Sequence, residues 1–283
     1  MILILTQCFP SRLGGIESLV SNLSLNLSKD EKVIVFADRH HIFYDAIYDN
    51  KYKNQLLIRR TSGLKFFRRR KKIKEIKLLI NSNKVKLIIS DTWKSLELGI
   101  DYFNQKKIPT LCLAHGNEFL SSNHKKIKRI QYILNKVSSI VTNSQFTKKL
   151  VENLIGKKST ISFVHPGAND LRNNREMQIP DIGGSPLILT LARLEKRKGH
   201  SFVIDSIKKL KKVFPNIQYI IAGDGPEKKS LKKLVEKYDL NFNVKFVGIV
   251  NEDQKKFLFQ RTDLMVMPTL DESYHSSIEG FGI

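Results

Sequence analysis

Short apolar runs alternate with amphipathic stretches along almost the whole chain. The runs are rich in β-branched residues, whereas the stretches between them carry apolar residues at helical spacing, as at Ile16, Leu19, Val20, Leu23 and Leu27. Strands that alternate with helices form βα units, and the strands of such units pair in parallel. The pattern therefore predicts an α/β fold built on parallel sheets.

The predicted strands fall into two groups separated by a polar, turn-rich stretch. The first group covers residues 1–6, 32–37, 55–61, 85–90, 110–114, 139–142 and 160–164. The second covers residues 187–191, 218–222, 244–247 and 264–267, with helices near 201–213, 228–238 and 251–260. We expect a domain at residues 1–170, a linker at 171–185 and a second domain at 186–283. Asn143 or Ser144 is placed to cap the helix that follows the strand 139–142.

The chain is strongly basic. Its 49 Lys and Arg residues against 27 Asp and Glu give a formal net charge of +22. Such a charge favours an anionic partner, which could be a membrane surface, a nucleic acid or a phosphorylated substrate. The sequence contains no RNP-like, KH-like or helix-turn-helix pattern, and its basic residues are not interleaved with an aromatic stacking platform. We therefore expect no nucleic-acid partner.

The cysteines and the apolar runs indicate the compartment. Cys8 and Cys112 lie in or beside strand-like apolar runs, which predicts buried packing rather than a disulfide. This cysteine usage is typical of a reducing cytosol. No window reaches the ~18 apolar residues of a membrane span, so any membrane contact is expected to be peripheral.

A basic helix is predicted between residues 65 and 77, with aromatic and aliphatic residues among its cations. Such a helix can place apolar groups into a membrane interface and leave its cations among anionic head groups. The residues predicted to contact the membrane are Phe66, Phe67, Arg68, Arg69, Arg70, Lys71 and Lys72, with Ile73 and Ile76 as further apolar anchors. The alternative is an ordinary solvated helix face. A second basic stretch spans residues 124–129 of the same domain.

Candidate binding residues follow the predicted strands of the first domain. Ligands of open α/β sheets bind beyond the carboxyl ends of the strands. Gly14 and Gly15 follow the first strand and precede a helix, so their backbone N–H groups can approach an anion. His115 follows the strand 110–114, where an imidazole can approach sugar hydroxyls. A tight turn and a structural histidine are the alternatives.

The strongest pair of candidate phosphate-binding residues lies near the start of the second domain. Arg193 and Lys198 follow the strand 187–191 and precede Gly199 and a new helix. The guanidinium offers a planar fork of donors to a phosphate, and the lysine adds a point charge. Gly223 and Gly225 repeat the strand, glycine turn and helix arrangement one unit later, where a nucleoside could approach the backbone. A solvated basic loop is the alternative for the cations.

Together with the carboxylate-bearing loop Glu279-Gly280-Phe281-Gly282, these residues resemble the family-four retaining glycosyltransferases of the GT-B fold. The resemblance also rests on Asn143-Ser144-Gln145-Phe146-Thr147 and on Pro166-Gly167. It implies two Rossmann-like, doubly wound parallel-sheet domains that face a cleft, with the second domain incomplete. Two departures are Ala192, where a glycine is usual, and Ala168-Asn169-Asp170, where Val-Asp is usual after the glycine.

The resemblance assigns roles to individual residues. It implies that Arg193 and Lys198 bind the donor diphosphate and that His115 lies by the transferred sugar. Gly14 and Gly15 would approach the phosphates from the facing domain. Glu279 would be the first acid of the E-x7-E motif, whose second acid would fall four residues past Ile283. The other expected donor-binding residues are Gly223, Gly225, Gly280, Phe281 and Gly282.

The expected function is transfer of a hexose from a nucleotide-diphosphate sugar to a glycan or lipid-linked acceptor, with retention of configuration. GDP-mannose is the favoured donor and UDP-sugars are the rival. We expect the reaction to need no metal or other cofactor. The protein is expected to act in the synthesis of cell-envelope polysaccharide or glycolipid, and to lie in the cytoplasm on the inner face of the plasma membrane. The alternatives are a non-catalytic remnant and a basic protein that binds membranes or nucleic acid.

Overall fold

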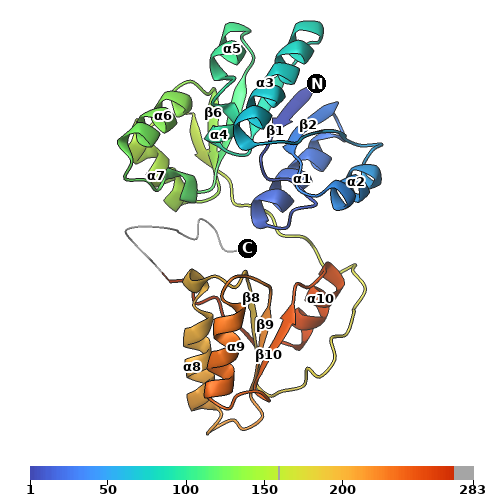
Figure 1. Cartoon of the computed structure of the whole chain (residues 1–283), viewed down its shortest axis with the longest axis vertical. Helices are drawn as coiled ribbons and strands as arrows, with labels where there is room; N and C mark the ends of the chain where they lie inside the picture. The colour runs from blue at the N-terminus through green and yellow to red at the C-terminus, as the bar shows by residue number, and fades with distance from the viewer. Residues whose placement is uncertain (159, 271–283) are drawn as a thin grey trace. The chain divides into compact units, whose positions relative to one another are not determined.

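A computed structural model describes residues 1–158 and 160–270, and contacts between Cα atoms divide the chain into two compact units. Unit 1 comprises Met1–Gly167, and unit 2 begins at Ala168. Each unit is an α/β body in which strands alternate with helices (Figure 1). The α/β fold with parallel sheets that the hydrophobic pattern predicted is confirmed.

Unit 1 is built on a seven-stranded sheet in which every pair of neighbouring strands is parallel, in the order β3-β2-β1-β4-β5-β6-β7. The strands are β1 (Ile2–Leu5), β2 (Val33–Asp38), β3 (Leu57–Thr61), β4 (Leu87–Ser90), β5 (Thr110–Ala114), β6 (Ser139–Thr142) and β7 (Ile161–Phe163). The strand order reverses between β1 and β4, which is the topological switch point where ligands of such sheets bind.

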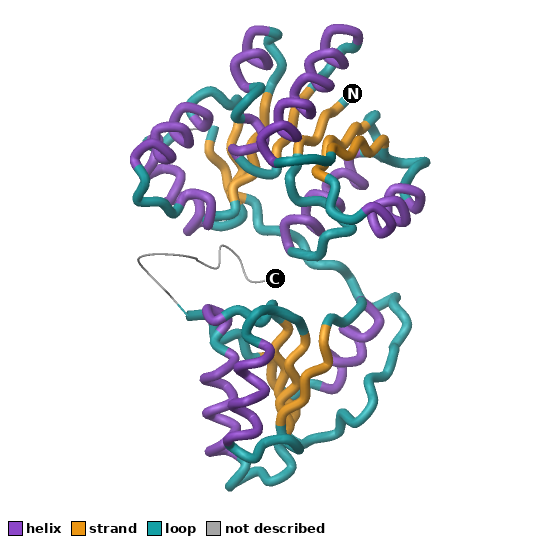
Figure 2. Tube along the Cα trace, viewed as in Figure 1, coloured by secondary structure: helices purple, strands orange, loops and turns teal. Residues whose placement is uncertain are grey.

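Helices cover both faces of this sheet (Figure 2). They are α1 (Gly15–Leu27), α2 (Ile42–Lys51), α3 (Lys65–Ser82), α4 (Trp93–Leu96), α5 (Ile100–Gln105), α6 (His124–Leu134) and α7 (Gln145–Ile155), with a short 3-10 helix, η1 (Asn117–Phe119). Leu3 and Leu5 of β1 pack in one hydrophobic cluster with Trp93, whereas Ile2 and Ile4 pack in another cluster. Side chains alternate across a strand, so burial on both faces explains its unbroken apolar sequence.

Unit 2 contains a smaller parallel sheet in the order β10-β9-β8-β11. Its strands are β8 (Leu187–Leu191), β9 (Gln218–Ala222), β10 (Val244–Gly248) and β11 (Leu264–Met265). Its helices are α8 (His200–Leu210), α9 (Lys228–Lys237) and α10 (Glu252–Arg261), and η2 (Lys196–Lys198) is a short 3-10 helix. Each of these strands and α-helices overlaps its predicted segment, although β11 is shorter than predicted; η2 was not predicted.

Local sequence signals explain where two of the helices begin. The Ser144 side chain accepts a hydrogen bond from the Thr147 amide and caps α7, which confirms one of the two predicted caps. Asn251 and Gln254 form a reciprocal capping box at the start of α10. Each cap satisfies amide groups that have no partner inside the helix.

Both cysteines are free, as the sequence predicted. Burial raises the pKa of Cys8 to about 12. Burial also raises the pKa of Cys112, which lies in the core of unit 1. These thiols are packing residues rather than nucleophiles. Among the described residues, none of the helices combines the length and the apolar character that crossing a bilayer demands.

The prediction for the basic helix is wrong for its buried residues. The ammonium of Lys72, with only 6% of the residue exposed, donates to Asp38 Oδ1 at 2.6 Å and to the Thr6 carbonyl at 2.7 Å. Ile73 and Ile76 pack in the core of unit 1. The helical period turns these three residues toward the sheet, so they cannot reach a membrane.

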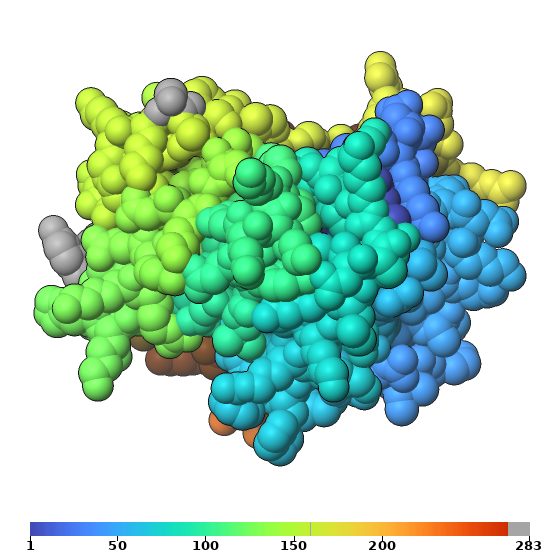
Figure 3. Space-filling model, turned by 90° about the horizontal axis from the view of Figure 1, so that it is seen from above, coloured from blue at the N-terminus to red at the C-terminus, as the bar shows by residue number. Residues whose placement is uncertain are grey.

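The exposed part of α3 is therefore narrower than predicted, although the helix contributes to the exterior of unit 1 (Figure 3). Arg68 is paired with Asp38 at 2.9 Å, and Arg69 is paired with Glu97 at 2.6 Å, so these arginines bind protein carboxylates. The exposed residues of the predicted membrane contact are Phe66, Phe67, Arg70 and Lys71.

We expect Lys72→Ala to lower the free energy of unfolding by about 3 to 5 kcal/mol, because the carboxylate of Asp38 would lose a buried partner. The adjacent exposed residue supplies the control, and Lys71→Ala should change this free energy by less than about 0.5 kcal/mol. Urea unfolding followed by circular dichroism measures both. Equal effects of the two substitutions would contradict the burial of Lys72.

Candidate functional site

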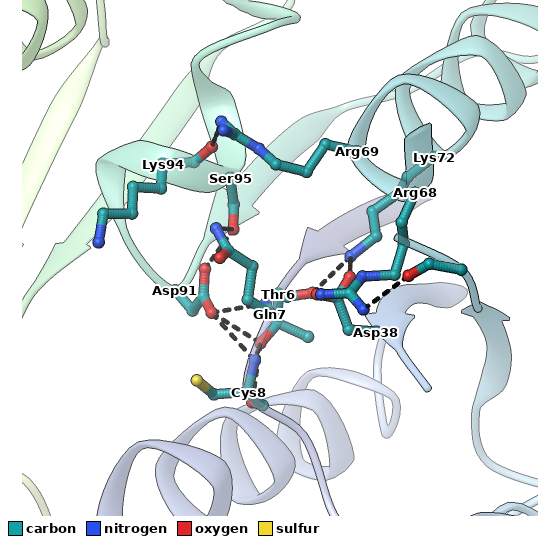
Figure 4. Close-up of polar contacts among 11 residues, drawn as sticks. Thr6, Gln7, Cys8, Asp38, Arg68, Arg69, Lys72, Asp91, Lys94 and Ser95 are labelled. Atoms are coloured by element: carbon teal, nitrogen blue, oxygen red, sulfur yellow. Dashed lines mark hydrogen bonds and ion pairs between the residues drawn. The ribbon is translucent and has the colours of Figure 1, made fainter. Parts of the chain in front are cut away.

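A buried carboxylate binds together the loops at the switch point of unit 1 through hydrogen bonds (Figure 4). Asp91, 1% exposed, directly follows β4. Its Oδ2 accepts hydrogen bonds from Thr6 Oγ1 at 2.9 Å and from the Gln7 amide at 2.8 Å. Its Oδ1 accepts from Ser95 Oγ at 2.5 Å. The end of β1 is thereby fixed against the end of β4, an anchor that the sequence analysis missed.

His115 is held by the same group of loops. Its Nε2 lies 2.9 Å from the Asp91 carbonyl oxygen, and its amide donates to Glu118 Oε1 at 2.7 Å. A carbonyl can only accept, so Nε2 carries the proton in this contact and Nδ1 is the remaining acceptor of the neutral ring. The Asn143 side-chain amide donates to the His115 carbonyl at 3.3 Å. The ends of β4, β5 and β6 thus meet at His115.

The glycine pair after β1 begins α1, as expected for an anion-binding turn. A Cβ atom on Gly14 would lie 2.2 Å from Glu17 Oε2, so the absence of a side chain makes room for this buried carboxylate. Glu17 in turn pairs with Arg12 Nε at 2.9 Å. Around Gly15 the space is open, with no described atom within 4 Å of an added Cβ.

The loop that carries this glycine pair is tied to α2 and β3. Ser11 Oγ donates to Asp45 Oδ1 at 2.7 Å, and Arg60 Nη1 lies 3.3 Å from the same oxygen. Burial would raise the pKa of Asp45, but hydrogen bonds from Ser11 and from the His40 amide, with the charge of Arg60, lower it below its usual value. Arg60 also donates to the Pro10 carbonyl. The segment before Gly14 is therefore fixed in place.

In unit 2, Arg193 and Lys198 lie in one loop between β8 and α8. The Arg193 side chain is 66% exposed, and its Nη1 lies 2.8 Å from Glu195 Oε1. The other oxygen of Glu195 accepts from Arg197 Nε at 3.0 Å. Lys198 lies in η2 and is 8% exposed, one residue before the positive-φ Gly199. The structure thus brings both predicted cations to the N-terminal end of α8.

The glycines after β9 bring two loops together. Gly223 has a φ of 143°, and a Cβ atom on it would lie 1.9 Å from the Ala192 carbonyl oxygen. A Cβ on Gly225 would lie 2.5 Å from the Leu194 carbonyl oxygen. The Leu194 amide also donates to the Asp224 carbonyl at 3.0 Å. The two glycines therefore pack the β9 loop against the loop that carries Arg193, a role that the sequence analysis did not assign to them.

A series of buried, hydrogen-bonded side chains supports the same loop. His200, 2% exposed, contacts Tyr219 Oη through Nδ1 at 3.2 Å and the Arg193 carbonyl through Nε2 at 3.4 Å. Tyr219 Oη donates to Thr190 Oγ1 at 2.9 Å. Burial lowers the pKa of His200, and the charge of Lys198 acts in the same direction. His200 and Tyr219 support the Arg193 loop, and the sequence analysis missed both. Their positions in a helix and a strand were the only signal that could have indicated this role.

The remaining predicted residues are Glu279, Gly280, Phe281 and Gly282, which lie outside the described residues. Within residues 1–158 and 160–270, no three His, Cys, Asp or Glu residues cluster as metal ligands would. A cavity of unit 2 with a volume of about 430 Å³ is lined by residues 181–184, 215–218, 242 and 243. It lies at the amino ends of β8 to β10, at the edge of the sheet opposite to Arg193.

Two family models match successive parts of the chain. The model described as Glycosyltransferase Family 4 matches residues 13–171, and the model described as Glycosyl transferases group 1 matches residues 173–283. The HepE protein of Anabaena, solved in complex with UDP, has the same fold. Its TM-score is 0.73 at 18% identity, and the match covers 95% of this chain and 74% of HepE.

Two relatives illustrate the range of the similarity. A GDP-mannose-dependent monoacylated alpha-(1-6)-phosphatidylinositol monomannoside mannosyltransferase from Corynebacterium glutamicum is 21% identical over 99% of this chain and 75% of its own length. The gpi3 subunit of the phosphatidylinositol N-acetylglucosaminyltransferase of Schizosaccharomyces pombe is 32% identical over 31% of this chain. The chain spans 19% of the length of that subunit.

We expect the stability of unit 2 to fall as the pH decreases below about 6.5, the usual pKa of histidine. Burial lowers the pKa of His200 in the folded state, so the unfolded state binds more protons in this range and the folded state loses stability relative to it. His200→Gln keeps hydrogen-bonding capacity and removes this titration. The difference in unfolding free energy between the wild type and the variant should shrink as the pH falls from 7 to 5. A pH-independent difference would contradict the prediction.

Proposed function

Because the chain belongs to glycosyltransferase family 4, we propose that it transfers a hexose from a nucleotide-diphosphate sugar to a glycan or lipid-linked acceptor, with retention of configuration. The observation that carries the proposal is the Arg193–Lys198 loop. Arg193 lies two residues after β8, and Lys198 lies two residues before α8 begins at His200. A helix N-terminus with adjacent cations is a recurrent binding site for phosphates.

The proposed role of the loop is to stabilise the departing nucleotide diphosphate. Negative charge grows on the diphosphate as the bond to the anomeric carbon breaks. The exposed guanidinium of Arg193 can donate two parallel hydrogen bonds to phosphate oxygens, and Lys198 adds a second positive charge. Both interactions strengthen as the charge develops, so they lower the barrier instead of only tightening substrate binding.

The proposed reaction proceeds on the face of the sugar from which the diphosphate leaves. The acceptor hydroxyl attacks the anomeric carbon, its proton passes to an oxygen of the leaving phosphate, and configuration is retained. His115 is proposed to hold a hydroxyl of the transferred sugar through Nδ1, because Nε2 is engaged by the Asp91 carbonyl. Glu279 keeps its proposed contact with the donor sugar. We propose that Arg193 and Lys198 supply the positive charge, with no metal required.

The proposed donor is GDP-mannose, with UDP-sugars as the rival. The mannosyltransferase of Corynebacterium glutamicum is described as GDP-mannose-dependent, which supports the first. The UDP complex of HepE supports the second. Both donors present the same diphosphate to Arg193 and Lys198. The proposed place of the reaction is the synthesis of cell-envelope polysaccharide or glycolipid.

The proposed membrane contact is now restricted to Phe66, Phe67, Arg70 and Lys71. Phe66 and Phe67 are 59% and 65% exposed at the start of α3, and the Arg70 guanidinium lies 3.4 Å from the centre of the Phe66 ring. Exposed aromatic rings beside cations suit the boundary between lipid head groups and acyl chains. We propose that this face of α3 contacts the anionic cytoplasmic surface of the inner membrane.

We expect Arg193→Ala to weaken the binding of GDP or UDP by about ten- to a hundredfold, the usual effect of losing charge-assisted hydrogen bonds. Arg175→Ala, at an exposed arginine of the same unit, is the matched control and should leave nucleotide affinity unchanged. Titration calorimetry measures the affinity, and release of nucleotide from GDP-mannose or UDP-glucose measures turnover. Equal effects of both substitutions would show that the Arg193 loop is not the diphosphate site.

We expect replacement of Phe66 and Phe67 by serine to reduce sedimentation with phosphatidylglycerol vesicles by about tenfold, because two aromatic rings would no longer enter the interface. Leu78→Ser tests another exposed apolar residue of α3, 62% exposed, and should sediment like the wild type. If the wild type stays in the supernatant, the proposed membrane contact is wrong.

A further inference from the structure

The cavity of about 430 Å³ at the amino edge of the sheet of unit 2 has no role in the proposed reaction. Three segments line it: residues 181–184 precede β8, residues 215–218 lead into β9, and residues 242 and 243 precede β10. The loop with Arg193 follows β8, so it lies at the opposite edge of the same parallel sheet. The volume falls within the range of ~300–1,000 Å³ that is typical of ligand pockets.

Hydrogen bonds join the three segments that line this cavity. The Asn243 side-chain amide donates to the carbonyl oxygens of Pro215 and Ile217, at 3.2 and 2.8 Å, and ties the segment before β10 to the segment before β9. Gln218 Oε1 accepts from the Gly183 amide at 3.2 Å, which adds the segment before β8. The protein itself holds the segments together, so a ligand would have little to order on binding.

The lining side chains outside these contacts offer one apolar and two polar groups. Phe242 is 95% exposed, so its ring contributes almost nothing to the core. Among the described residues, the side-chain amide of Asn216 has no hydrogen-bond partner. Asp181 Oδ2 lies 3.0 Å from Lys245 Nζ, which leaves Oδ1 to accept a further hydrogen bond. The cavity therefore combines an aromatic ring with a donor and an acceptor.

The charge of the cavity argues against an anionic ligand. Its lining, as far as the structure describes it, contains no lysine or arginine, and Asp181 is its one charged residue. The ammonium of Lys245 compensates that carboxylate. Phosphates are bound by cations and by charge-assisted hydrogen bonds, which this lining does not supply. The cavity instead suits a neutral molecule with hydroxyl groups and an apolar face.

We propose that this cavity binds a neutral pyranose unit of a glycan. One face of a pyranose ring presents C–H groups, which contact the electron-rich face of an aromatic ring such as that of Phe242. Sugar hydroxyls both donate and accept, so they can pair with Asp181 Oδ1 and with the Asn216 amide. This inference rests on the proposed function, because it takes the ligand to be part of the glycan that the enzyme extends, held away from the reacting sugar.

The test measures the binding of three neutral disaccharides, mannobiose, maltose and lactose, to the full chain by NMR titration. Phe242→Ser removes the aromatic ring, and Phe259→Ser is its control at an exposed phenylalanine of α10 that does not line the cavity. Asn216→Ala and Asn241→Ala form a second matched pair, because both asparagines are exposed and only Asn216 lines the cavity. Circular dichroism verifies that each variant is folded.

We expect at least one disaccharide to bind, and Phe242→Ser to weaken its binding at least about tenfold, because the contact with the ring is lost. Asn216→Ala should weaken binding about two- to tenfold, the usual effect of one hydrogen bond. Phe259→Ser and Asn241→Ala should match the wild type. All four variants should keep wild-type affinity for GDP or UDP, since the Arg193 loop lies at the other edge of the sheet.

Three results would overturn the proposal. The first is that none of the disaccharides binds to the wild type, and the second is equal weakening by Phe242→Ser and Phe259→Ser. The third is weakening by His115→Ala but not by Phe242→Ser, which would place the sugar at the loops of unit 1. Nucleotide binding separates this proposal from the proposed function. A wild type that binds a disaccharide through Phe242, but neither GDP nor UDP, would support the cavity site and refute the donor site.

Discussion

The candidate donor site depends on the close approach of two backbone loops in unit 2. Gly223 and Gly225 lie against the carbonyl oxygens of Ala192 and Leu194, at distances that leave no room for a Cβ atom. That contact fixes the segment from which Arg193 projects. The same segment is also held by buried side chains. His200 contacts Tyr219 Oη through one ring nitrogen and the Arg193 carbonyl oxygen through the other. The cation reaches solvent from a loop whose backbone is held on two sides, which is the preorganisation that charge stabilisation requires.

Unit 1 meets the same requirement with a buried carboxylate. Asp91 joins the end of β1 to the end of β4, and its carbonyl fixes the imidazole of His115. Asp45 and Arg60 hold the loop that leads to Gly14. In each unit, residues outside the proposed ligand contacts determine where the candidate binding groups lie. This arrangement follows from parallel strands, whose carboxyl ends bring distant parts of the chain to one edge.

The sequence was sufficient for the strands of both sheets and for several of the loops that follow them. The strand at residues 110–114 and the loop with Arg193 and Lys198 could be predicted, because apolar runs and adjacent glycines are local signals. Lys72 could not be predicted correctly, since a lysine in a basic helix gives no sign that it is 6% exposed and bound to Asp38. Asp91 was missed because its partners at the end of β1 are 83 to 85 residues away in the chain.

The most direct measurement is the affinity of Gly225→Ala for GDP and UDP, compared with Gly183→Ala. The added methyl of Gly225→Ala would collide with the Leu194 carbonyl, whereas Gly183 has no described atom within 4 Å of an added Cβ. If the close approach of the loops builds the diphosphate site, the Gly225 variant should stay folded by circular dichroism and bind nucleotide at least about tenfold more weakly. Wild-type affinity in a folded Gly225→Ala protein would contradict the account.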